Sequence, residues 1–192
     1  LAPEEFSRLL DVSKKQAGAI NGIAAAPLWW SLLSAIWDAG RRRGTMLAAE
    51  WSWLDPPVMW FRSSAQKENR GQACKLSRDT LAAIEQIRRP ERRRIWDFGR
   101  ADRQVAQWLA GLYRAAGLDV PDKPFHVLRR CHATYVRKAA GIEAARESLG
   151  HSSRQVTNLY IDPSKIGATS GCDLMPRGEG MRFADTRQQW LF

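Results

Sequence analysis

The chain has 192 residues, enough for one well-cored domain with a short appended tail. Its 30 Lys and Arg residues against 20 Asp and Glu residues leave a net charge of +10, which favours an acidic partner, above all nucleic acid. A basic protein that is merely soluble is the alternative. The three cysteines are far apart and form no CxxC pair, which excludes a disulfide framework and indicates a reducing cytosol.

The N-terminal region gives no sign of export or of membrane insertion. Residues 1–6 are acidic, so we expect no signal peptide. Residues 17–37 carry no charge, but Asn21, Gly22 and Pro27 interrupt the apolar run. A buried helix that begins near Pro27 fits this composition better than a membrane span.

Hydrophobic spacing predicts an α+β fold class, mainly α-helical with one small antiparallel β-sheet. The sheet is expected from residues 58–62 and 72–76, on either side of a polar loop. Gly40 and Gly117 end two of the helices, and Ser77 is the expected N-cap of a third. In chain order, helices are predicted at residues 3–10, 27–39, 41–50, 78–88, 101–116, 125–140, 142–149 and 153–160.

The strongest candidate for chemistry is an ordered set of residues in the last third of the chain. His126 and Arg129 face the same side of a helix, and an arginine fork matches phosphate oxygens. Gly150 lets the chain turn so that His151 points back to that face, and Tyr160 follows nine residues later. Taken singly, these residues have structural alternatives: a helix-surface accident, a capping histidine and a buried tyrosine. Together, without a nearby carboxylate, they suit holding and attacking a phosphate.

This set resembles the C-terminal signature of the tyrosine recombinases, or phage-type integrases. Their pattern is an arginine, a lysine, His-x-x-Arg, a second His or Trp, and a nucleophilic tyrosine. The segment that starts at Gly40 resembles the family's Gly-Leu-Arg-x-x-Glu, and its register selects Arg42 as the first arginine. Arg41 stands where the family has an apolar residue, and Thr45 where it has an acid.

The resemblance also implies a hairpin lysine and a set of phosphate contacts. The hairpin position corresponds to Lys67, with Arg70 as the second choice. The arginines of residues 92–94 have a solvated loop as their alternative. The predicted DNA-binding residues are Arg41, Arg43, Arg70, Arg92, Arg93, Arg94 and Arg130.

The implied activity is that of a site-specific DNA recombinase with the DNA breaking-rejoining fold. Tyr160 would attack a phosphodiester and form a 3′-phosphotyrosyl bond, without metal, ATP or any other cofactor. Arg42 and Arg129 would hold the phosphate oxygens, and His151 would donate a hydrogen bond to the same phosphate. His126 would take the proton from the tyrosine, and Lys67 would protonate the leaving oxygen.

The resemblance, which covers residues 3–160, implies a catalytic domain over residues 1–163 that acts on double-stranded DNA as a homo-oligomer, a tetramer of two dimers. Residues 164–192 form a tail that docks to a neighbouring protomer or folds back on its own domain. The family's N-terminal core-binding domain is missing, and with no initiator Met we expect a cut-out catalytic domain of a cytoplasmic protein of a bacterium or phage. A type IB topoisomerase-like enzyme and an idle DNA-binding module are the competing interpretations. Zinc binding through His126, Cys131, His132 and His151 fails on ligand spacing, and His132 is expected in the core.

Overall fold

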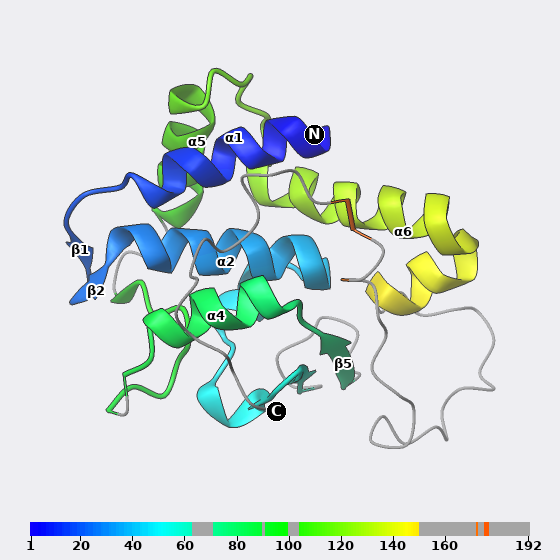
Figure 1. The fold of residues 1–192 in the computed structure, drawn as a ribbon, viewed down its shortest axis with the longest axis horizontal. Helices are drawn as coiled ribbons and strands as arrows, with labels where there is room; N and C mark the ends of the chain where they lie inside the picture. The colour runs from blue at the N-terminus through cyan, green and yellow to red at the C-terminus, as the bar shows by residue number, and fades with distance from the viewer. Residues whose placement is uncertain (63–70, 90, 100–103, 150–171, 173–174, 177–192) are drawn as a thin grey trace.

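Helix α2 (Ala25–Ala39) runs through the middle of the molecule, and the longer helices pack around it (Figure 1). The computed structural model describes residues 1–62, 71–89, 91–99, 104–149, 172 and 175–176. Helices α1 (Pro3–Lys14), α4 (Arg78–Gln86) and α6 (Pro124–Leu149) each contact α2, and α5 (Val105–Ala115) packs against α1 and α6. The resulting helical domain carries a small antiparallel sheet, which confirms the predicted fold class.

The central position of α2 follows from its composition. Thirteen of its 15 residues are buried, as expected for a helix that is apolar on nearly every side. The helix ends where predicted, because Gly40 takes a left-handed conformation with φ of 60° and its N–H bonds Ile36. Among the described residues, no helix combines the length and the apolar character that crossing a membrane requires.

Helix α1 extends four residues beyond its predicted end and covers one side of α2. Pro3 occupies the first helical position, and Glu5 accepts a hydrogen bond from the backbone N–H of Ala2 at 2.8 Å. The indole of Trp37 stacks on Phe6 with ring centroids 4.0 Å apart and planes at 6°. These contacts join α1 to the C-terminal half of α2.

The three-stranded sheet has the order β3 (Leu54–Asp55), β4 (Val58–Phe61), β5 (Gln72–Lys75), with Met59 opposite Cys74. The two predicted strands are confirmed. Strand β3 has only two residues, too few for a periodic signal. A second hairpin, β1 (Ala19–Ile20) with β2 (Ile23–Ala24), was missed although Asn21-Gly22 is a strong turn signal.

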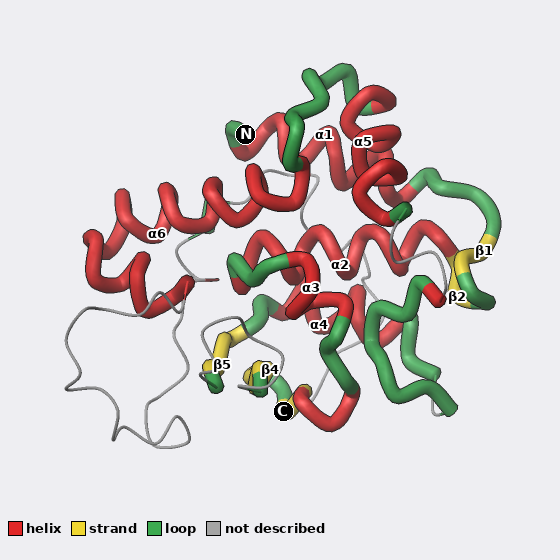
Figure 2. Tube along the Cα trace, turned by 180° about the vertical axis from the view of Figure 1, so that it is seen from behind, coloured by secondary structure: helices red, strands yellow, loops and turns green. Residues whose placement is uncertain are grey.

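The predicted helix at residues 41–50 is wrong. Helix α3 covers only Arg43–Leu47, because Arg42 is extended (φ −67°, ψ 148°). A single 3₁₀ turn, η1 (Trp51–Trp53), follows. Seen from behind, the chain turns at Gly40, at the C-terminal end of α2, and leads into α3 (Figure 2). Helix α4 begins after Ser77, which accepts a bond from the N–H of Thr80 as an N-cap.

Helix α6 is two helices joined at Gly141. There the backbone leaves the helical region (φ 89°, ψ 176°), which matches the predicted break between residues 140 and 142. The predicted helix at residues 153–160 lies outside the described residues. In the tail, Cys172 and Met175 are described; both are buried, and Met175 packs against the main core. The docking predicted for the tail stays a prediction.

Candidate functional site

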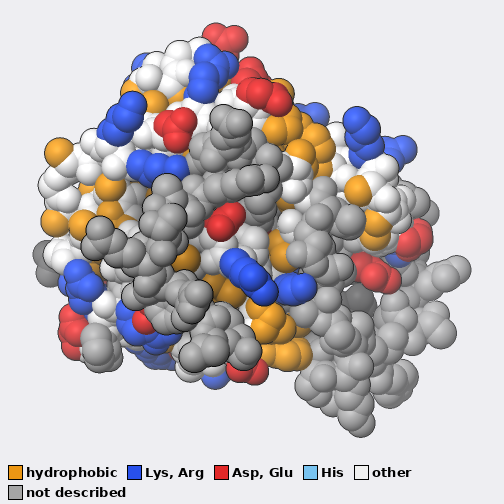
Figure 3. Space-filling model, viewed as in Figure 1, with side chains coloured by type: hydrophobic (Ala, Val, Ile, Leu, Met, Phe, Trp, Pro, Cys, Tyr) orange, Lys and Arg blue, Asp and Glu red, His pale blue; other side chains and the backbone are white. Residues whose placement is uncertain are grey.

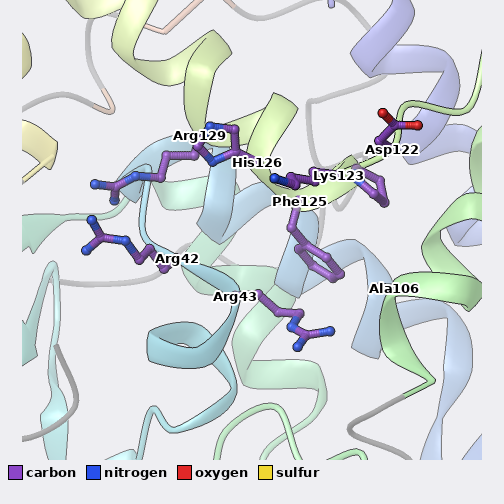
Figure 4. Close-up of a pocket in the computed structure, with 9 residues that line it drawn as sticks. Arg42, Arg43, Ala106, Asp122, Lys123, Phe125, His126 and Arg129 are labelled. Carbon is purple, nitrogen blue, oxygen red and sulfur yellow. The ribbon is translucent and has the colours of Figure 1, made fainter. Parts of the chain in front are cut away.

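A pocket of about 260 Å³ opens between the start of α3 and the start of α6 (Figure 4). It brings the first arginine of the predicted set next to the His-x-x-Arg pair. More than 80 residues separate that arginine from the pair in the sequence. Its lining is formed by Arg42, Arg43, Ala106, Asp122, Lys123, Pro124, Phe125, His126 and Arg129.

Two arginines from different elements face the same side of this pocket. Arg42 is half-buried and stands immediately before α3, just after the turn at Gly40. Arg129 lies in the first half of α6, and its guanidinium points to the same side as that of Arg42 (Figure 4). His126 lies beside Arg129, one turn earlier on the same helix, and is exposed. Two cations and an imidazole around one space form a suitable receptor for a phosphate group.

The orientation of Arg129 is fixed by two backbone carbonyls. Its side chain is only 5% exposed. Nη1 donates to the carbonyl oxygen of Gly40 at 2.6 Å, and Nη2 donates to that of Leu149 at 2.9 Å. The guanidinium therefore links the C-terminal end of α2 to the last turn of α6 and keeps its plane at the edge of the pocket.

Arg41 has a different environment from its neighbours. It is 2% exposed, bonds the amide oxygen of Gln72, and lies over the Phe61 ring at 5.2 Å. The Phe61 ring stabilises the buried cation through its π face. The phosphate contact predicted for Arg41 would require the side chain to leave this site.

The sequence placed His132 in the core, which is confirmed, but gave no indication of its hydrogen bonds. Nδ1 lies 2.8 Å from the carbonyl oxygen of Trp37, and Nε2 contacts Oγ of Ser148. Burial, with smaller contributions from Arg41 and Arg129, lowers the pKa of His132 to about 4 despite the opposing bond to Trp37. The ring is therefore neutral at pH 7. Because a carbonyl only accepts, Nδ1 carries the proton and Nε2 accepts from the hydroxyl of Ser148.

His132 also restricts which residue can occupy position 40. A Cβ atom added at Gly40 would lie 2.7 Å from Cγ of the imidazole, closer than real atoms approach. The positive φ at Gly40 disfavours a side chain independently of this clash.

The other predicted DNA-binding residues are dispersed over the surface. Arg93 pairs with Glu50 at 2.9 Å and thereby lowers the pKa of that carboxyl, while Arg92 lies 3.5 Å from Asp97. Arg94 forms a backbone bridge to Glu50. Their loop is thus tied to the domain, while the Arg93 side chain stays 81% exposed. On the face in Figure 3, basic side chains alternate with acidic ones among the described residues.

For the exposed candidates, the phosphate contact stays a prediction. Arg43 lines the pocket and Arg130 lies one residue beyond Arg129; both are exposed. Lys123 also lines the pocket and was not predicted; its signal in the sequence is its place three residues before His126. Four predicted site residues lie outside the described residues: Lys67, Arg70, His151 and Tyr160.

Solved structures with a similar fold include recombinases and integrases. XerA recombinase superposes with a TM-score of 0.63 at 17% identity, over 85% of this chain and 59% of that one. The catalytic domain of bacteriophage HP1 integrase gives 0.60 at 18%, over 83% and 84%. The lambda integrase catalytic core gives 0.59 at 18%, over 79% and 94%. The fold is that of a tyrosine recombinase catalytic domain.

The resemblance to these enzymes is structural. No protein-family profile matches the chain, and no curated protein matches it by sequence. The superposed region includes most of this chain but only part of the larger enzymes, namely 59% of XerA and 47% of XerH. The two integrase catalytic domains, in contrast, are covered almost throughout.

Proposed function

We propose that the chain is the catalytic part of a site-specific DNA recombinase or integrase that cuts and rejoins DNA through a 3′-phosphotyrosyl intermediate. The observation that carries this proposal is the meeting of Arg42, His126 and Arg129 at one pocket. The tyrosine recombinase fold is a second line of support. In addition, the three residues that line this pocket are those that the family motif selected in the sequence.

The proposed step is an in-line displacement at a DNA phosphodiester. The Tyr160 oxygen bonds to phosphorus as the bond to the 5′ oxygen breaks, and Lys67 protonates the leaving oxygen. Arg42 and Arg129 stabilise the negative charge that builds on the non-bridging oxygens, assisted by His151. His126 accepts the phenol proton, which a tyrosine retains at neutral pH. A 5′ hydroxyl later attacks the phosphotyrosyl bond and reseals the strand.

The other two tyrosines of the chain do not suit the role of nucleophile. Tyr113 is fully buried, and burial raises the pKa of its hydroxyl far above the usual value. Tyr135 donates to the carbonyl oxygen of Leu1 at 3.2 Å, and burial raises its pKa as well. Neither lines the pocket. This leaves Tyr160 as the tyrosine assigned to the reaction.

We further propose that the protein acts as a homo-oligomer on double-stranded DNA. Solved relatives of the same fold include XerH bound to its difH substrate, a lambda integrase dimer on a core site and a lambda integrase tetramer on a Holliday junction. Exposed Arg43, Arg93, Arg94 and Arg130 supply phosphate contacts, so affinity should fall steeply with salt.

The test is a suicide substrate, a nicked duplex that loses a short fragment on cleavage and so traps the adduct. Without a known site, a mixed-sequence pool is used, in buffer without metal, and products are separated under denaturing conditions. We expect a covalent protein–DNA adduct with the wild type and with Tyr135→Phe, and none with Tyr160→Phe. An adduct that survives Tyr160→Phe would contradict the assignment of the nucleophile.

The same experiment separates the competing functions. A protein that relaxes a supercoiled plasmid alone but never joins two duplexes would be topoisomerase-like. Salt-sensitive DNA binding without any adduct, in a chain extended at its N-terminus as well, would favour an idle binding module.

A further inference from the structure

The last turn of α6 is held by side chains from β5 and from the earlier part of α6 itself. Arg129 donates to the carbonyl of Leu149 at 2.9 Å, and Gln72 of β5 donates to the carbonyl of Glu147 at 3.3 Å. Between them, His132 accepts from the hydroxyl of Ser148. We call Gln72, Arg129, His132 and Ser148 the polar clamp.

The polar clamp supplies side-chain donors to two backbone carbonyls at the end of the described part of α6. Side chains commonly donate to carbonyls near the C-terminus of a helix. Gln72 and Arg129 supply donors to Glu147 and Leu149, the latter of which is buried. The positive guanidinium also counters the negative end of the helix dipole.

The three side chains that bond the last turn, those of Gln72, Arg129 and His132, each make a second contact near Arg42. Arg129 bonds Gly40, two residues before Arg42, and His132 bonds Trp37 in the last turn of α2. Gln72 accepts from Arg41. The polar clamp therefore connects the last turn of α6 to the strand and the helix end around Arg42 by three separate bridges.

Fold stability alone gives little reason for this arrangement. His132 and Ser148 are 1% and 3% exposed, and burying polar groups is unfavourable unless every partner is in place. Apolar side chains of similar size commonly fill such sites at equal or better stability. What polar contacts add is direction, because hydrogen bonds tolerate only a narrow range of distance and angle. The clamped turn ends at Leu149, directly before Gly150-His151 in the sequence.

We infer that His132, acting with Ser148, is a positioning residue that sets the last turn of α6 relative to Arg42 and Arg129, and so fixes where the chain toward His151 and Tyr160 departs. The inference rests on the proposed function for its effect on the reaction. Its structural half, the holding of the turn, is independent of any activity.

The test uses two substitutions at position 132 that each retain one ring nitrogen's contact. In His132→Asn, the amide takes the place of Nδ1, keeps the bond to Trp37 and loses Ser148. In His132→Gln, the amide reaches the place of Nε2 and restores the bond to Ser148. We expect His132→Asn to slow single-turnover adduct formation by about tenfold to a hundredfold, the scale of a small misplacement of reacting groups. DNA affinity stays unchanged, and His132→Gln reacts faster than His132→Asn, because the bond to Ser148 is the one that reaches the last turn.

Ser148→Ala should slow the reaction as much as His132→Asn does, and the double variant should be no slower than either single one, because both remove the same bond. Equal rates for His132→Asn and His132→Gln would overturn the inference, since a merely structural histidine would not distinguish the two amides.

Hydrogen exchange of residues 143–149 provides the readout that needs no activity. We expect faster exchange in His132→Asn than in wild type or His132→Gln, with α1 and α2 unchanged. A last turn equally protected in all three proteins would overturn the inference. A wild type that forms no adduct but shows the expected exchange difference would contradict the proposed function and leave the holding of the turn supported.

Discussion

The two ends of helix α2 are buried by different means. Its N-terminal half packs mainly through apolar side chains, as where Trp29 meets Phe98 edge-on with centroids 5.1 Å apart. Its C-terminal end is surrounded by buried polar groups: Asp38, Arg41, Thr45, Arg129 and His132. Apolar burial stabilises whatever the exact orientation, whereas polar groups in a core must each meet a partner. The pocket lies at the polar end, where orientation matters most.

The largest effect should come from the apolar end. Trp29 is 2% exposed, so Trp29→Ala leaves a cavity and should lower the free energy of unfolding by about 3–5 kcal/mol. Urea unfolding measures this loss. The adduct rate per folded molecule should stay near the wild-type value at low temperature. A rate that falls in proportion to the loss of stability would mean that the two ends are not separable.

At the polar end, Arg129→Met is expected to change the reaction rate of the folded protein. Removing a positioned donor to the phosphate should slow adduct formation by about a hundred- to a thousandfold. Arg114→Met on α5, where the side chain is exposed and away from the pocket, serves as the matched control. Single-turnover rates at saturating DNA decide the outcome. A normal rate in Arg129→Met would remove this arginine from the mechanism.

Acid should weaken the polar end selectively through His132. In the unfolded chain the ring takes a proton near pH 6.5, but in the folded protein its pKa is lowered to about 4, mainly by burial. Between pH 4 and pH 6.5 the unfolded state therefore binds more protons than the folded state. The free energy of unfolding falls as the pH drops through this range, by up to about 3 kcal/mol. The neighbouring charged groups Arg41 and Arg129 act in the same direction.

Urea unfolding between pH 7 and pH 4 tests this dependence. The slope over this range should be shallower in His132→Gln, which has no titrating ring. An unchanged slope in that variant would assign the acid sensitivity to other groups.

A smaller effect is expected at Ser77, where the polar end contacts α4. Its hydroxyl caps α4 and also donates to the buried carboxylate of Asp38 at 2.8 Å. Ser77→Ala should cost about 1 kcal/mol in stability, the usual value of an N-cap. The measurement is again urea unfolding, with Ser77→Thr as the conservative control. Because the pocket is not involved, adduct formation should not change.

The sequence predicted those features that depend on neighbouring residues. The end of α2 at Gly40, the cap at Ser77 and the break at Gly141 each follow from local backbone preferences. Of the site, Arg42, His126 and Arg129, which the family motif selected, line one pocket, and their catalytic roles stay predictions. Such motifs record which residues meet, which is why they succeed across long separations.

What escaped prediction depends on contacts between distant segments that no motif records. Gln72 and Glu147 are 75 residues apart, and His132 and Trp37 are 95 residues apart. The burial of Arg41 has the same origin, since Phe61 and Gln72 come to it from another element. The helix predicted at residues 41–50 failed because the chain extends at Arg42 to reach the pocket.

Gly40 and His132 cannot vary independently of each other. The imidazole occupies the space that any side chain at position 40 would need, and the positive φ at Gly40 adds a separate restriction. A smaller residue at position 132 would remove the clash with the imidazole, but the restriction from the positive φ would remain. In homologous chains, we expect position 40 to accept other residues only where both the imidazole and the left-handed turn are absent. Directed libraries that randomise position 40 alone should return glycine.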